Sequence, residues 1–341
     1  MKPSDVEMNS TTLDNSVAAN TTTDHHNSDS EEDTQPQEVG KDSLEDGFLD
    51  DVPDDTEDLD VVHERLTTLE RLGLERFTNL QRISFRQNLL SKLLPLPNKT
   101  LTELDFYDNR LTRIENLDHL TDLTSLDLSF NKIKHIDNVD KLTNLTELFF
   151  VANKVSKISG VSTLVNLRNL ELGANRIRVI ENLEPLVNLE QLWLGKNKIT
   201  KLQGLDQLKN LKLLSIQSNR LQKIEGLSNL SKLEELYLSH NAIETIEGLE
   251  NNTNLQTVDV SANRIKKLEG LEKLSHLSEL WANDNQLTSY EDVEAQLKDK
   301  KELQTVYFER NPLQTAAQAT YRLKIKTLLP RVTQIDAALV R

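Results

Sequence analysis

Apolar residues recur along this chain in a fixed phrase between residues 80 and 311. The phrase is leucine, two variable residues, leucine, one variable residue, leucine, two variable residues and asparagine, as in LTSLDLSFN at Leu123. Every step between closing asparagines is 22 residues from Asn109 to Asn285, with a first step of 21 and a last step of 26. Such a period predicts a solenoid, in which each repeat packs mainly against its neighbours.

Each repeat has two halves with different apolar spacing. The first half alternates apolar and variable residues, which predicts a strand with one buried face, and stacked strands of this kind make a parallel sheet. The second half has roughly three-residue apolar spacing with a Gly or Asn turn, which favours a short 3₁₀-like return. The closing asparagine can satisfy backbone groups at the bend between the halves. We therefore predict an α/β solenoid with a curved parallel β-sheet on its concave face and short 3₁₀ or helical returns on its convex face.

The pattern divides the chain into four parts. Residues 1–60 are rich in acids and poor in large apolar residues, so we expect a disordered acidic tail. Residues 61–79 read as a degenerate repeat that caps the array, and residues 80–311 as about eleven or twelve repeats of 22 residues. Residues 312–341 form a C-terminal cap. The longer last interval predicts an additional helix within 289–303.

Charge is distributed unevenly between these parts. The formal net charge is −15, but residues 1–60 hold 19 acids and 2 bases, whereas the remaining residues hold 36 acids and 38 bases. The acidity therefore belongs to the tail, and electrostatic arguments about the repeats must be local. Ser28 and Ser30 lie beside acids and are candidate phosphorylation sites for an acidophilic kinase, although a solvated tail is the simpler interpretation.

Motifs that carry chemistry are missing from the sequence. It contains no cysteine, which suits a reducing compartment. Nothing resembles a nucleophile elbow, a metal-binding HExxH, a phosphate loop or a dinucleotide fingerprint. The apolar runs are too short to span a bilayer, and no apolar signal sequence follows Met1. We expect no enzyme, no cofactor, no bound metal and no membrane association.

Binding side chains, by contrast, follow the repeat. On each strand the positions six, four and two before the asparagine point away from the core and line the concave face. The position four before it, named here the central column, includes an aromatic every 44 residues from Phe149 to Trp281. Its members from the third repeat onward are Asp127, Phe149, Glu171, Trp193, Ser215, Tyr237, Asp259, Trp281 and Tyr307. Exposed aromatic residues in a row are typical of protein interfaces.

Acidic residues share the same face. The three outward positions hold nine acids, and their only bases are Arg82 and Arg86 of the first repeat. The acids are Glu103, Asp105, Asp127, Glu147, Glu171, Glu235, Asp259, Glu279 and Glu309. This segregation predicts a protein partner with a basic surface and argues against nucleic acid, which requires Lys and Arg.

Several segments resemble one family closely. ELYLSHNAIETIEGLENN at 235–252, SANRIKKLE at 261–269, VYFERNPLQ at 306–314 and LPRVTQIDAALVR at 329–341 resemble the SDS-type 22-residue leucine-rich-repeat regulatory subunits of protein phosphatase 1. The resemblance spans about 80–341 and implies a leucine-rich-repeat solenoid with a C-terminal cap. It also implies that the concave face binds the catalytic subunit of protein phosphatase 1. The contact residues that it implies are Asp127, Phe149, Glu171, Trp193, Glu279, Trp281 and Tyr307, to which the central column adds Tyr237 and Asp259.

The resemblance carries further implications and leaves alternatives. It implies a ternary complex with a small disordered phosphatase inhibitor, residence in the nucleus with room for a cytoplasmic pool, and a role in chromosome segregation and the cell cycle. We expect a monomer when the chain is on its own. A spliceosomal leucine-rich-repeat protein with an RNA-recognition partner and a cytoskeletal adaptor are the alternatives. Arg82-Ile83-Ser84-Phe85 matches a short phosphatase-docking motif, but Ile83 and Phe85 occupy inward positions, where we expect core.

Overall fold

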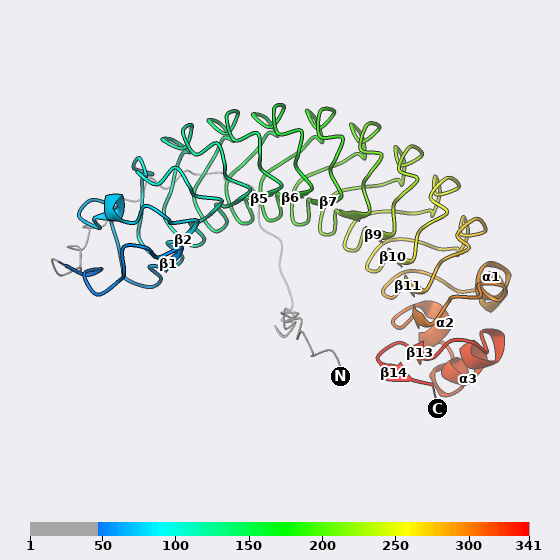
Figure 1. Ribbon diagram of the computed structural model, residues 1–341. Helices are drawn as coiled ribbons and strands as arrows, with labels where there is room; N and C mark the ends of the chain where they lie inside the picture. The colour runs from blue at the N-terminus through cyan, green and yellow to red at the C-terminus, as the bar shows by residue number, and fades with distance from the viewer. Residues whose placement is uncertain (1–46, 341) are drawn as a thin grey trace, which may run out of the picture. The chain divides into compact units, whose positions relative to one another are not determined.

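Fourteen short strands follow one another in a single sheet over residues 47–340, the part of the chain that the computed structural model describes (Figure 1). Neighbours from β1 to β13 are parallel, and only β13 and β14 are antiparallel. The strands are β1 Asp58–Asp60, β2 Arg82–Ser84, β3 Glu103–Asp105, β4 Ser125–Asp127, β5 Glu147–Phe149, β6 Asn169–Glu171, β7 Gln191–Trp193, β8 Leu213–Ser215, β9 Glu235–Tyr237, β10 Thr257–Asp259, β11 Glu279–Trp281, β12 Thr305–Tyr307, β13 Gln334–Ile335 and β14 Ala338–Leu339.

The predicted parallel sheet is confirmed, and it lies along the inner side of the curved stack of repeats (Figure 1). Between the sheet and the outer returns the leucines form one continuous core, in which Leu126 and Leu148 are fully buried. The returns consist of single turns, such as Leu120 N donating to Leu117 O at 2.9 Å and Leu123 N donating to Leu120 O at 3.1 Å. Of the residues described, only η1, Leu74–Arg76, forms a 3₁₀ helix, so the predicted 3₁₀ character persists as isolated turns.

Asparagine side chains join each repeat to the one before it. Asn131 Nδ2 donates to Phe106 O at 2.9 Å in the preceding repeat and to Leu128 O at 3.1 Å in its own. Its Oδ1 accepts from Leu111 N at 2.9 Å. The side chain thus satisfies three buried backbone groups at the bend, as the repeat pattern predicted.

The sheet begins earlier than the sequence indicated. β1 pairs with β2 so that Asp58 is opposite Arg82 and Asp60 is opposite Ser84, and Leu49 and Leu59 are only 7% and 4% exposed. The predicted disordered tail of residues 1–60 is therefore wrong for 47–60, because one inward leucine between two outward aspartates suffices for an edge strand despite its acidity. Residues 1–46, with Ser28 and Ser30, lie outside the described residues.

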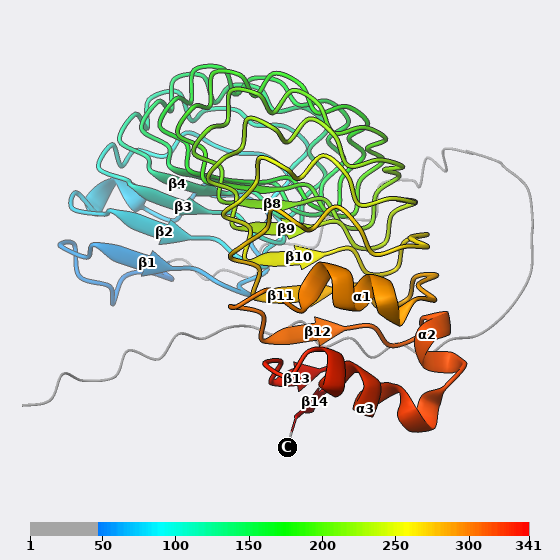
Figure 2. The same cartoon turned by 90° about the vertical axis from the view of Figure 1, so that its right-hand side faces the viewer.

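Helices appear only towards the C-terminus of the described chain, apart from η1. The predicted helix within 289–303 is α1, Tyr290–Leu297, whose Ser289 hydroxyl accepts from Asp292 N at 3.0 Å. α2, Pro312–Thr315, and α3, Gln318–Leu328, follow β12, and β13 and β14 complete the cap (Figure 2).

The cap ends the repeat ladder with a different side chain. Asp336 Oδ1 accepts from Phe308 N at 2.8 Å and Glu309 N at 3.0 Å, and Asp336 Oδ2 accepts from the Tyr321 hydroxyl at 2.8 Å. These bonds satisfy backbone donors of the last repeat that have no further repeat to pair with. No helix within residues 47–340 is long and apolar enough to cross a membrane.

Candidate protein-binding face

The strand ladder aligns the central column across the concave face. Asp127 is the partner of Phe149, Phe149 of Glu171, and Glu171 of Trp193. The same pairing continues to Trp281 and Tyr307 on β11 and β12. The predicted column is therefore one continuous row of neighbours, although its members differ in exposure and in the partners they find.

Three rings form an aromatic cluster at the C-terminal end of the column. The centroids of Tyr237 and Trp281 are 6.3 Å apart and those of Trp281 and Tyr307 are 5.8 Å apart, both in edge-to-face geometry. Trp281 Nε1 donates to Glu279 Oε2 at 3.2 Å, and the Tyr237 hydroxyl donates to Glu235 Oε2 at 2.6 Å. The rings are only partly buried, so the cluster presents a fixed apolar surface with carboxylates at its edge.

Asp259 lies beneath this cluster. Tyr237 and Trp281 stand on β9 and β11, yet their rings meet because the short Asp259 side chain of β10 between them is only 5% exposed. Its Oδ1 accepts from Ser261 N at 2.9 Å and from Ser261 Oγ at 2.6 Å. The sequence placed Asp259 among the outward contact residues, whereas the structure gives its carboxylate an internal hydrogen-bonding role.

Three carboxylates gather in the middle of the face, and we name Asp127, Glu147 and Glu171 the acidic cluster. Burial raises the pKa of both the Asp127 and the Glu171 carboxyl, and the charges of Asp127 and Glu147 raise the pKa of Glu171 further. Asp127 accepts a hydrogen bond from Ser129 N at 2.8 Å. No base among the described residues forms an ion pair with any of the three. The nearby Arg86 charge lowers the pKa of Asp127 without forming an ion pair with it. A cation from a partner would therefore meet carboxylates that no ion pair occupies within residues 47–340.

Phe149 and Trp193 occupy the column beside this acidic cluster, and both are half-buried. Trp193 Nε1 is buried and has no hydrogen-bond partner in the described structure. Ser215 separates Trp193 from Tyr237 and is itself 1% exposed, with its hydroxyl bonded to Gln217. The regularly spaced aromatic residues of the central column therefore form two groups in the structure. Phe149 and Trp193 lie near the acidic cluster, and the other rings form the aromatic cluster.

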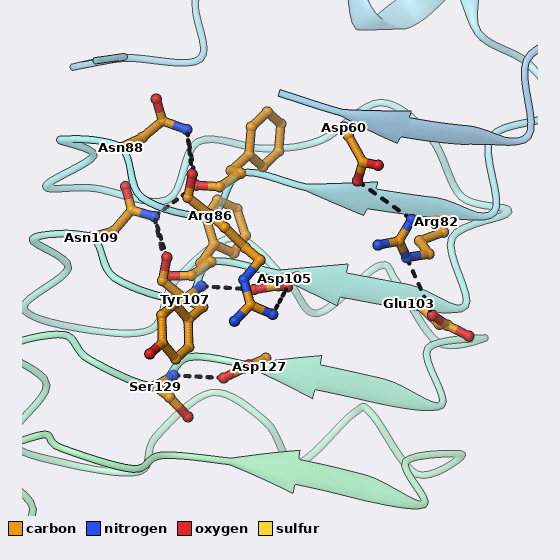
Figure 3. Close-up of polar contacts among 12 residues, drawn as sticks. Asp60, Arg82, Arg86, Asn88, Glu103, Asp105, Tyr107, Asn109, Asp127 and Ser129 are labelled. Atoms are coloured by element: carbon orange, nitrogen blue, oxygen red, sulfur yellow. Dashed lines mark hydrogen bonds and ion pairs between the residues drawn. The ribbon is translucent and has the colours of Figure 1, made fainter. Parts of the chain in front are cut away.

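A further set of side chains on the first repeats was missed by the column pattern. The Arg86 guanidinium carbon lies 4.1 Å from the Tyr107 ring centroid, and Arg86 Nη1 is 3.1 Å from Asp105 Oδ2 (Figure 3). The Tyr107 ring in turn contacts Phe130, which is 44% exposed, at a centroid distance of 4.8 Å. Tyr107 lies two residues before Asn109, and Phe130 lies one residue before Asn131. The sequence signal for this set was therefore aromatic residues close to the asparagines but outside the central column.

The two bases of the face are both engaged within the chain. Arg82 Nη1 is 3.4 Å from Asp60 Oδ1 and its Nε is 3.7 Å from Glu103 Oε2 (Figure 3). Ile83 and Phe85, which belong to the apparent docking motif, are fully buried as expected. From β4 onward Glu309 pairs with Arg310 at 2.8 Å, and the other outward acids form no ion pair within residues 47–340.

No group of three or more His, Cys, Asp or Glu side chains within residues 47–340 is placed to hold a metal ion. The face offers partly exposed rings and carboxylates, which are groups for recognising another protein.

A family model for leucine-rich repeats in two copies matches residues 99–141, 165–207, 209–251 and 253–295, together half of the chain. The chain belongs to the leucine-rich-repeat family. An internalin of Listeria monocytogenes has the same fold, with a TM-score of 0.67, 25% identity and coverage of 84% of this chain and 88% of its own. The functional domain of InlJ from Listeria monocytogenes aligns with a TM-score of 0.60 at 22% identity, over 83% of this chain and 53% of its own.

Curated relatives are similar over shorter stretches. The protein phosphatase 1 regulatory subunit SDS22 of Schizosaccharomyces pombe is 50% identical over 76 residues, 22% of this chain and 23% of its own. SDS22 of Saccharomyces cerevisiae is 48% identical over 96 residues, 27% and 28% of the two chains. Human protein phosphatase 1 regulatory subunit 7 is 54% identical over 46 residues, 14% and 12%. Each alignment spans less than a third of the relative's length, and together they confirm the resemblance to SDS-type repeats.

Proposed function

We propose that this chain is a non-catalytic regulatory subunit that binds the catalytic subunit of protein phosphatase 1 through its concave face and controls the activity, maturation or nuclear targeting of the phosphatase. The observation that carries the proposal is the acidic cluster beside the aromatic residues of the central column. It occurs in a chain about half identical to SDS22 proteins over the matched segments. The roles of Asp127, Phe149, Glu171, Trp193, Tyr237, Asp259, Glu279, Trp281 and Tyr307 in this contact belong to the proposal.

The two groups on the face have different tasks in this mechanism. The rings of the aromatic cluster are held by each other and by Glu235 and Glu279, so little side-chain entropy is lost when a partner covers them. The carboxylates of the acidic cluster form no ion pair with a base of residues 47–340. They attract Lys or Arg of the partner, which raises the association rate and fixes orientation. The partner surface that fits is a basic one with apolar residues near one end.

The cellular setting is part of the same proposal. We place the chain in the nucleus, with a cytoplasmic pool, as a monomer that joins the phosphatase in chromosome segregation and the cell cycle. A small disordered phosphatase inhibitor would complete a ternary complex. Support for these points comes from the SDS-type resemblance alone.

Affinity capture from a nuclear extract tests the proposal against its rivals. The tagged chain should retain the phosphatase catalytic subunit, identified by mass spectrometry, and Glu171→Ala should reduce the amount retained by about tenfold or more, because interface hot spots contribute about 2 kcal/mol or more. Glu250→Ala, an exposed glutamate outside the three outward strand positions, is the matched control. Recovery of splicing proteins or tubulin without the phosphatase would reject the proposal.

A further inference from the structure

The segments that follow the asparagines carry a second charge pattern, away from the central column. In six consecutive repeats the four residues after the asparagine are RLTR, KIKH, KVSK, RIRV, KITK and RLQK, beginning at residues 110, 132, 154, 176, 198 and 220. These 24 residues hold 12 of the 40 Lys and Arg of the chain and no Asp or Glu. The bases of the solenoid are thus concentrated along one flank, where the chain leaves the sheet for the convex side.

The first residue of each segment forms the basic band, which consists of Arg110, Lys132, Lys154, Arg176, Lys198 and Arg220. The backbone of the band is fixed by a ladder of hydrogen bonds between repeats, in which Lys154 N donates to Ile133 O and Lys198 N donates to Ile177 O, both at 2.8 Å. One base therefore projects per repeat at the strand spacing of about 4.8 Å. The next residue inward, such as Ile177, is fully buried, which holds the band on the surface.

Within residues 47–340 the charges of the basic band are not neutralised by ion pairs. No side chain of the band forms an ion pair or a side-chain hydrogen bond with any residue in 47–340. The second base of a repeat behaves differently, since Arg113 Nη2 is 2.9 Å from Glu115 Oε2 and Lys201 Nζ is 3.8 Å from Glu225 Oε1. Six cations without partners thus stand in a row on a fixed backbone, which is a preorganised site for negative charge.

The surroundings of the band decide between kinds of anionic partner. Carboxylates follow on the convex side, among them Glu115, Glu181 and Glu225, and the central column supplies more on the concave side. A nucleic-acid duplex is wider than this strip and would bring phosphates over those carboxylates. Single-stranded nucleic acid favours aromatic platforms, yet the 24 residues contain only His135 as a ring. An extended acidic peptide is narrow enough to contact the band alone.

We propose that the basic band binds an extended Asp- and Glu-rich segment of a partner protein. Six bases at about 4.8 Å span about 24 Å, which an extended chain covers in about seven or eight residues. The strand spacing does not match the peptide repeat, so a run of consecutive acids fits better than a sequence with fixed spacing, because screened charges act over about 8 to 10 Å. The band and the concave face are separate surfaces, so this contact stands or falls independently of phosphatase binding.

Fluorescence anisotropy with a labelled oligoglutamate of about twelve residues tests the assignment on the full-length chain. The variant Lys154→Glu/Arg176→Glu/Lys198→Glu reverses the centre of the band, and Lys141→Glu/Lys209→Glu/Lys273→Glu makes the same charge change at exposed lysines elsewhere. We expect saturable binding that weakens between about 0.05 M and 0.15 M salt. Reversal of the band should weaken it at least about tenfold, since exposed pairs contribute about 1.5- to 5-fold each, whereas the control should stay within about twofold.

A triple glutamine variant at the same three band positions should give an intermediate loss, and it serves if the reversed variant is poorly folded by circular dichroism. Equal losses in the band and control variants would overturn the assignment, because binding would then follow net charge. Absence of saturable binding at about 0.05 M salt would overturn it as well. Tighter binding of a labelled oligouridylate of equal charge would reject an acidic peptide as the occupant.

Discussion

Trp281→Ala removes the ring at the centre of the aromatic cluster. We expect one effect on the stability of the fold and a second effect on binding. The substitution deletes two edge-to-face contacts, with Tyr237 and Tyr307. At about 0.5 to 1.5 kcal/mol per aromatic pair, the free energy of unfolding should fall by about 1 to 3 kcal/mol. An interface hot spot adds a loss of at least about 2 kcal/mol in binding, which is about a thirtyfold rise in Kd.

Isothermal titration with purified phosphatase catalytic subunit measures the second effect, and urea unfolding measures the first. Trp281→Phe keeps a ring but loses the 3.2 Å bond from Nε1 to Glu279, so it should lie between wild type and alanine in both assays. Phe48→Ala removes an aromatic that is 40% exposed outside the central column and should leave Kd within about twofold. A folded Trp281→Ala variant with wild-type affinity would refute the hot-spot assignment.

Three further predictions follow from particular contacts. Because burial raises the pKa of Glu171 in the folded state, this carboxyl binds more protons in the folded chain than in the unfolded one. Its contribution to stability should therefore fall as pH rises from about 4.3 through the raised pKa. Glu171→Gln should flatten that decline in urea unfolding measured as a function of pH. Asn153→Ala should cost about 3 kcal/mol, because it orphans buried backbone groups, whereas Asn144→Ala, at an exposed bond of 3.0 Å, should cost under about 1 kcal/mol. Gly160 has φ 72°, and an added Cβ meets Ile136 O, so both alanine and asparagine are strained there. Gly160→Ala should destabilise more than Gly160→Asn, because the asparagine amide can donate a hydrogen bond to that carbonyl.

Each of these three has a distinct contradicting result. Parallel pH profiles for wild type and Glu171→Gln would show that this carboxyl carries no net proton linkage. Equal losses of stability in Asn153→Ala and Asn144→Ala would contradict the role of the buried asparagines in joining the repeats. For the glycine, Asn182 occupies the same position one repeat later, and its Nδ2 donates to Ile158 O at 2.7 Å. An asparagine variant at residue 160 as unstable as the alanine variant would therefore contradict the comparison.

The repeat geometry was predictable because stacking dictates it. A 22-residue period fixes which leucines face inward, and the closing asparagines have one way to satisfy the bend, as Asn131 shows. The start of the sheet was not predictable in the same way. β1 contributes a single inward residue, Leu59, within a run of acids, so composition concealed it.

The candidate site, too, was only partly predictable from the sequence. That Phe149, Trp193 and Trp281 share a column follows from period alone, and the strand pairing agrees. Which side chains remain available does not follow from period, because it depends on the size of neighbours. Asp259 is covered because the rings beside it are large and it is short. The basic band was not predictable for a different reason. The sequence shows a base at the same position of six repeats, but only the structure shows that these bases form no ion pairs within residues 47–340.

The proposed function requires that the concave face captures the phosphatase. Its most direct test is titration of the purified catalytic subunit of protein phosphatase 1 into three proteins: wild type, Glu171→Ala/Trp281→Ala, and the basic-band variant Lys154→Glu/Arg176→Glu/Lys198→Glu. We predict saturable one-to-one binding for wild type and little change for the band variant. For the concave double variant we predict a loss of about 4 kcal/mol, or about a thousandfold, if its two sites add. Wild-type affinity in a folded concave double variant, or no binding by the wild-type chain, would contradict the claim.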